Sequence, residues 1–114
     1  MEQGEADITT YNLLASDVPE LQKDDSLNVQ IYDSTRVNWA ILNVPKLKTL
    51  EVRQGLCYAF PYTENIDSIN KGLMQRSGPI PSTMRGYDKD AFQFPTDLDK
   101  AKELLLAGGA EEGQ

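Results

Sequence analysis

The fold is decided by the stretch from Glu51 to Gly109, which contains three short phrases: EVRQGLCYAF at 51–60, SGPIPSTMRGYD at 77–88 and DLDKAKELLLAGG at 97–109. In the first phrase Val52, Leu56, Ala59 and Phe60 share one helical face. Pro61 follows and ends a helix, because proline lacks the backbone N–H that the helix needs. The first phrase therefore predicts a helix over 50–60.

The second and third phrases predict a loop and another helix. Proline and glycine recur from 75 to 95, which is typical of a long loop restrained by proline. Thr96 is the expected cap of the last helix, with Asp99 completing a variant capping box. Its buried face is expected to hold Leu98, Ala101, Leu104 and Leu105, and Gly108-Gly109 to end it.

The chain before this stretch predicts short strands. Apolar residues at 27, 29 and 31 alternate with polar ones over 26–33, and residues 36–44 are apolar on both faces, as in an inner strand. The short 33–35 turn favours antiparallel pairing of these two strands. A further strand is expected over 4–11, a short helix near 17–24 with Pro19 in its first turn, and a helix from 63 or 65 to about 72. The expected fold class is α+β: short antiparallel strands, then helices.

Length, composition and charge exclude several classes of function. A chain of 114 residues with 39% hydrophobic and 25% charged residues is expected to form one folded segment, 1–114. The net charge of −7 repels phosphate backbones, so no nucleic-acid partner is expected. No apolar run is long enough to cross a bilayer, and the first residues lack the basic and apolar parts of a signal peptide.

Catalytic chemistry is not indicated. The chain has one cysteine and no histidine, so the commonest general base is absent. Cys57 is expected to be a buried structural cysteine, since a catalytic thiol would need a lysine or arginine partner. The acidic clusters lack the spacing of a calcium loop and suit helix caps and solvated surface. We expect no enzyme activity, no metal and no cofactor.

Recognition is the remaining class of function. Tyr32, Arg36, Trp39 and Tyr87 are best suited to it, because aromatic faces and a guanidinium offer contact area and directed hydrogen bonds. For Trp39 packing in the core is favoured, because it shares a strand face with Val37 and Ile41.

The three phrases also carry a resemblance. VRQGLCYA at 52–59, GPIPSTMRGYD at 78–88 and DKAKELLLAG at 99–108 resemble, in order and spacing, the middle of the family 5 extracellular solute-binding proteins. These are the oligopeptide, dipeptide and nickel receptors of ABC importers. The segments at 4–8 and 41–43 are similar to that family as well. The chain departs from the family pattern at Pro61-Tyr62 and in the short connector 45–49, which precedes the 50–60 helix.

The resemblance implies a fragment of a larger receptor with two lobes of the periplasmic-binding-protein type II fold. Residues 1–33 would be the end of one lobe, and 34–114 the hinge and the first part of the other. Arg36, Asn38 and Trp39 are the residues expected to face the ligand cleft. The resemblance further implies a peptide or other small solute as ligand, importer membrane subunits as partners, and a periplasmic or membrane-anchored extracellular location for the parent.

A rival hypothesis assigns no transport role. In it the chain is a free-standing α+β interaction domain that uses an exposed face of the 37–44 strand. An unpaired strand edge also predicts self-association of the chain.

Overall fold

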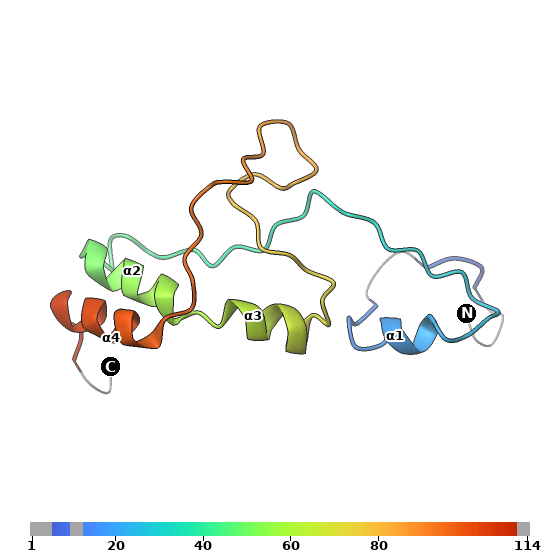
Figure 1. The fold of residues 1–114 in the computed structure, drawn as a ribbon, viewed down its shortest axis with the longest axis horizontal. Coiled ribbons are helices and arrows are strands. Elements are labelled where there is room, and N and C mark those ends of the chain that lie inside the picture. Colours follow the sequence, from blue (N-terminus) through green and yellow to red (C-terminus); the bar gives the residue numbers. More distant parts are fainter. Residues whose placement is uncertain (1–5, 10–12, 112–114) are drawn as a thin grey trace.

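Helices are the regular elements of the part of the chain that the structure describes. The structure is a computed structural model, and it describes residues 6–9 and 13–111. The elements run in the order α1 (Val18–Leu21), α2 (Leu50–Ala59), α3 (Tyr62–Glu64), the π-helix η1 (Asn65–Ile69) and α4 (Leu98–Ala107). Figure 1 shows α1 at one end of the molecule and α2 beside α4 at the other. None of the described helices is long and apolar enough to span a membrane.

The α2–α4 pair is held together by a close approach at Gly55. Gly55 is buried, and Ala101 on the facing helix is only 2% exposed. A Cβ atom at Gly55 would lie 3.1 Å from the Ala101 carbonyl oxygen and 2.9 Å from Leu105 Cγ. Since no side chain fits between the two backbones, glycine at this position lets the helices touch.

Hydrogen bonds at both ends show that α2 and α4 are antiparallel. The Thr49 hydroxyl, before α2, donates to the Gly108 carbonyl after α4 at 3.2 Å. At the other end the Asp97 N–H donates to the Tyr58 carbonyl at 2.9 Å. The start of each helix is thereby tied to the end of the other, which confirms the predicted helices over 50–60 and at the C-terminal end.

The caps of α4 differ in part from the prediction. Asp97, not Thr96, is the N-cap, and its carboxylate accepts the Lys100 N–H at 2.9 Å. The helix ends as predicted, with Gly109 at φ 86° and the Gly109 and Ala110 N–H groups bonded to the Leu106 and Leu105 carbonyls, a Schellman motif. The expected buried position of Leu98 is wrong, since Leu98 is 67% exposed.

Pro61 ends α2 as predicted and makes a sharp turn into α3. Its φ of −82° and ψ of 73°, with a 3.0 Å hydrogen bond from the Tyr62 N–H to the Phe60 carbonyl, define an inverse γ-turn. The helix expected from 63 or 65 is present as α3 and η1. It begins at Tyr62, and its second part is a π-helix.

The predicted α+β fold is wrong for the described residues, because they contain no strand. Residues 26–44 instead run extended in one direction from α1 towards α2, so the 33–35 segment bends the chain without reversing it (Figure 1). A strand needs a neighbour for its backbone hydrogen bonds, and among the described residues no backbone hydrogen bond pairs residues 28–42 with another segment. Of the strand expected over 4–11, residues 6–9 are not in a strand, and 4, 5, 10 and 11 lie outside the described residues. The helix expected near 17–24 is present but short, as α1.

Little of the described chain is buried. Its radius of gyration is 19.0 Å, whereas a compact domain of this length would have about 13 Å. The buried residues among those described are Val18, Gly55, Pro81 and Ala101. Trp39 is 61% exposed, so the predicted core position is wrong. Cys57 is half-buried, which contradicts the expectation of full burial. The exposed apolar residues of the extended segment are Ile31, Tyr32, Trp39, Ile41 and Val44.

Candidate functional site

Segment 34–41 and the loop over 77–91 meet at one hydrogen bond. The Thr83 hydroxyl in the loop donates to the Ser34 carbonyl at 3.3 Å. Ser34 is also fixed locally, since its hydroxyl accepts the Arg36 N–H at 3.2 Å. This contact brings the predicted site segment next to a loop that lies about fifty residues further along the chain.

Arg36, Asn38 and Trp39 are all exposed on segment 34–41. In an extended chain, side chains two residues apart share a face and adjacent ones point to opposite faces. Arg36 and Asn38 therefore belong to one face, and Trp39 belongs to the other with Val37 and Ile41. The structure keeps the three residues accessible but does not gather them around one point.

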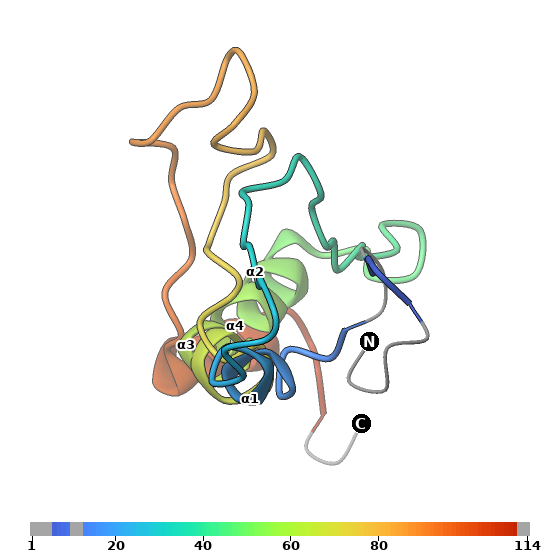
Figure 2. The ribbon, with the colours of Figure 1, turned by 90° about the vertical axis from the view of Figure 1, so that its right-hand side faces the viewer.

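The loop 77–91 projects away from the helices and is shaped by its own turns (Figure 2). The Met84 N–H donates to the Pro81 carbonyl at 3.0 Å, and the Tyr87 N–H donates to the Met84 carbonyl at 3.2 Å. Gly86, at φ 93°, has the left-handed backbone that the second turn requires. Pro81 is buried inside the loop. The proline-restrained loop predicted from the sequence is present.

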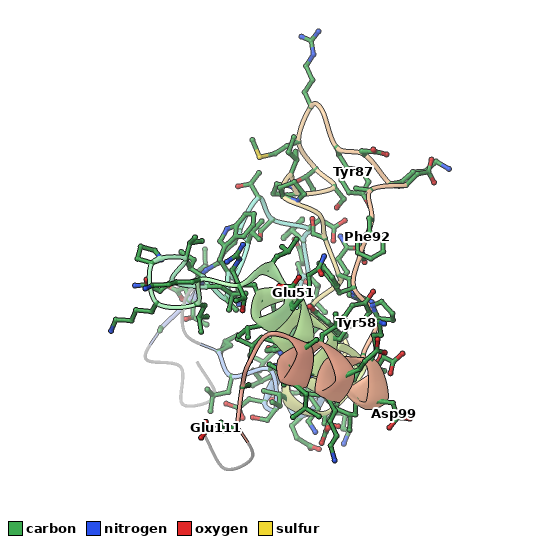
Figure 3. All side chains as sticks on the ribbon, turned by 90° about the vertical axis from the view of Figure 1, so that its left-hand side faces the viewer. Glu51, Tyr58, Tyr87, Phe92, Asp99 and Glu111 are labelled. Carbon is green, nitrogen blue, oxygen red and sulfur yellow. The ribbon has the colours of Figure 1, made fainter. Side chains whose placement is uncertain are left out.

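An aromatic junction at the base of this loop was not predicted. We define it as Tyr58, Phe60 and Tyr62 on the helical side with Phe92 and Phe94 on the returning limb of the loop. The Tyr58 and Phe94 rings meet edge to face at 5.1 Å, Phe92 and Phe94 do so at 4.9 Å, and Phe60 and Tyr62 are tilted at 4.9 Å. Figure 3 shows Tyr87 on the projecting loop, with Phe92 and then Tyr58 closer to the helices.

Thr96 and Arg76 complete the junction. The Thr96 hydroxyl donates to the Phe60 carbonyl at 2.7 Å and accepts the Tyr62 N–H at 3.2 Å. The Arg76 guanidinium lies 4.2 Å from the centre of the Tyr62 ring and donates to the Phe94 carbonyl. The spacing of aromatics at 58, 60 and 62 and at 92 and 94 is the sequence signal that could have revealed this cluster, but nothing local links Arg76 to it.

Burial raises the pKa of Tyr62, the neighbouring Cys57 adds to the rise, and Arg76 opposes it. Tyr62 is therefore a neutral phenol at physiological pH, with its ring face available to the Arg76 cation. In the part of the chain that the structure describes, no three histidine, cysteine, aspartate or glutamate residues are grouped to hold a metal ion. The arrangement offers aromatic faces, a guanidinium and extended backbone, which are means of recognition.

Comparison with known proteins identifies the class. The family model described as bacterial extracellular solute-binding proteins, family 5 Middle, matches residues 1–114. The chain belongs to this family of solute-binding proteins. The predicted resemblance is confirmed.

Individual relatives carry names that specify a ligand. The chain is 35% identical to the dipeptide-binding protein of Escherichia coli (strain K12), over 86% of this chain and 19% of that protein. It is 34% identical to di/tripeptide-binding protein 1 of Pseudomonas aeruginosa (strain UCBPP-PA14), over 99% of this chain and 21% of that protein. A more distant relative, 25% identical, is heme-binding protein A of Haemophilus influenzae. The chain spans about a fifth of the length of these relatives.

Proposed function

We propose that this chain is part of a peptide-binding receptor of an ABC importer and has no catalytic activity. The observation that carries the proposal is the family match over 1–114 together with two relatives named for dipeptides and tripeptides. The parent protein would be exported, bind its solute between two lobes and deliver it to the importer's membrane subunits. Residues 1–33 would end one lobe, and 34–114 would form the hinge and begin the other.

Arg36, Asn38 and Trp39 would contribute to the cleft wall. The Arg36 guanidinium suits the carboxylate of a peptide, and the Asn38 amide can both donate to and accept from a peptide backbone. Trp39, on the other face of the extended segment, offers apolar area. Support comes from their exposure and from the loop that lies against the same segment. Closure would follow from ligand contacts that are made only in the closed state.

The first experiment determines the native mass of the gene product in its source cell, with the reading frame sequenced on both sides. A native product with a second lobe supports the receptor, and a native product of 114 residues contradicts it. Calorimetry with the dipeptide alanyl-phenylalanine then compares the longer product with Arg36→Ala and with Arg85→Ala as control. Arg36→Ala should weaken binding about tenfold or more, as expected for loss of a charge-assisted pair. Arg85→Ala should leave binding unchanged.

The 114-residue chain by itself should bind this dipeptide weakly or not at all, because it supplies only part of one cleft wall. Micromolar binding by the short chain would contradict this proposal.

The second candidate function is a protein-interaction domain. Residues 37–44 carry no charged side chain and include three residues exposed by more than half, Trp39, Ile41 and Val44. They run extended without ladder partners in the described part of the chain. Such an edge can pair with another polypeptide strand, a second copy of the chain included.

Sedimentation equilibrium at increasing concentration tests the second candidate. The chain should associate, and Ile41→Lys should weaken the association because a charge is introduced on the exposed apolar face of the extended segment. The matched control is Ile69→Lys, since Ile69 is also an exposed isoleucine but lies on η1. A chain that stays monomeric at millimolar concentration would rule this candidate out.

A further inference from the structure

The loop 77–91 is attached to the rest of the molecule through two limbs. The outgoing limb follows η1 and contains Arg76, and the returning limb contains Phe92 and Phe94 and leads into α4. Figure 1 shows both limbs rising from the region of α3 and α4 to the projecting loop. The position of the loop therefore depends on what fixes each limb.

The returning limb is fixed without Arg76. Thr96 bridges the Phe60 carbonyl and the Tyr62 N–H, the Asp97 N–H is bonded to the Tyr58 carbonyl, and the Phe94 ring packs edge to face on Tyr58. These contacts tie the limb to the end of α2 and the start of α3. They involve the backbone on both sides, so they leave this limb little freedom.

The outgoing limb is joined to the returning limb by Arg76. Among the hydrogen bonds of the described residues, the one that connects these two limbs runs from the Arg76 guanidinium to the Phe94 carbonyl. The same guanidinium lies over the Tyr62 ring at 4.2 Å, so one side chain contacts α3 and the returning limb together. A planar guanidinium can present its face to a ring while its edge donates hydrogen bonds, which a lysine ammonium cannot do in the same way.

The loop lies against the candidate ligand-binding segment at Thr83. Thr83 donates to the Ser34 carbonyl, two residues before Arg36. Within the loop, the Gln75 amide donates to the Ser82 hydroxyl at 2.8 Å and the Ser77 hydroxyl donates to the Ile80 carbonyl at 3.1 Å. These short-range bonds stiffen the first part of the loop, so a change at its base is carried to Thr83.

We propose that Arg76 is a positioning residue that clamps the two limbs together and thereby sets the loop 77–91 against segment 34–41. The role of this contact in ligand binding rests on the proposed function, but the clamp itself does not. Release of Arg76 would let the outgoing limb and the loop move while α2 and α4 stay paired.

The test is millisecond amide hydrogen exchange of the whole chain without ligand. Arg76→Gln should increase exchange over 77–91 about tenfold, the effect of losing one charge-assisted hydrogen bond and a cation–π contact. Exchange within α2 and α4 should not change. Arg85→Gln is the matched control, because it removes the same charge from an exposed position within the loop 77–91 and should have no effect.

Three further variants separate positioning from general loss of structure. Arg76→Lys should restore part of the protection, since the ammonium can stay over the Tyr62 ring. Tyr62→Leu should cause a smaller increase than Arg76→Gln, since the bond to the Phe94 carbonyl remains. Thr83→Val should increase exchange around residue 83 in the wild-type background and add little in Arg76→Gln, where the loop is already released.

Three results would each contradict the clamp. Exchange over 77–91 could be the same in Arg76→Gln and Arg85→Gln, or exchange in α2 and α4 could rise as much as in the loop. The third is that the effects of Arg76→Gln and Thr83→Val on exchange are additive. None of these readouts involves a ligand. A result that contradicts the clamp therefore does not bear on the proposal of peptide binding, and an absence of peptide binding does not contradict the clamp.

Discussion

The α2–α4 pair and the extended segment 26–44 use similar amounts of apolar sequence with opposite results. In the helical pair, Gly55 and Ala101 bring two backbones into contact and bury each other. In the extended segment, Trp39 and Ile41 are 61% and 88% exposed. Helices satisfy their own backbone and need only one apolar face covered, whereas an extended chain needs a neighbour for its backbone as well. Apolar residues thus stabilise this molecule only where backbone geometry provides a partner.

The largest expected effect is loss of the helical pair. Gly55→Leu would place a side chain where even a Cβ atom lies 3.1 Å from the Ala101 carbonyl oxygen. We expect the free energy of unfolding to fall by about 3 kcal/mol, because the helices must separate. Urea denaturation followed by far-ultraviolet circular dichroism measures it. Lys102→Leu on the exposed side of α4 is the control and should change stability by less than about 0.5 kcal/mol. Equal effects would show that the close approach is unimportant.

A smaller loss is expected at the start of α4. Asp97→Ala removes the carboxylate that accepts the Lys100 N–H at 2.9 Å. Loss of such a cap lowers stability by about 1 kcal/mol. Asp97→Asn should retain most of the stability because its amide oxygen can still accept, and the same denaturation experiment compares the two. If asparagine is as damaging as alanine, the carboxylate acts through its charge and not as a hydrogen-bond acceptor.

The extended segment should contribute almost nothing to the free energy of unfolding. Trp39→Ala is expected to change the free energy of unfolding of the chain by less than about 0.5 kcal/mol, whereas a buried tryptophan would cost about 3–5 kcal/mol. The reason is that Trp39 is 61% exposed. Circular dichroism must be used, since Trp39 is the single tryptophan and its fluorescence is lost with it. A loss above about 2 kcal/mol would mean that this segment packs in solution.

The smallest effect concerns local order at the start of the extended segment. Hydrogen bonds from the Ser26 hydroxyl and backbone N–H, at 2.6 and 2.9 Å, hold the pKa of Asp24 below its ordinary value of 3.8. The stabilisation is present while the carboxylate is ionised and is lost as the pH falls through the lowered pKa. Ser26→Ala should move the Asp24 pKa back towards 3.8, as measured by carboxyl carbon NMR titration. An unchanged pKa would show that the backbone N–H alone sets it.

For the candidate site, the sequence indicated which residue types could bind a ligand but not which residues they contact in the fold. The choice of Arg36, Asn38 and Trp39 came from a family resemblance, and their part in a cleft remains a prediction. All three residues are exposed. The exposure of Trp39 was not predicted, because the alternating pattern predicted a strand face covered by the core. Arg76 was missed because its partners, Tyr62 and Phe94, lie 14 and 18 residues away along the chain.

The sequence by itself determined the elements whose hydrogen bonds close within a few residues: α2, its stop at Pro61, and α4 with its glycine end. It also determined the family. Tertiary structure alone decided that 26–44 has no strand partner among the described residues, that Thr96 bonds to Phe60 and Tyr62 instead of capping α4, and that Arg76 joins the limbs of the loop. Local patterns report the first kind of bond because donor and acceptor are close in the chain. The second kind joins groups far apart in sequence, so only the folded arrangement selects among the available partners.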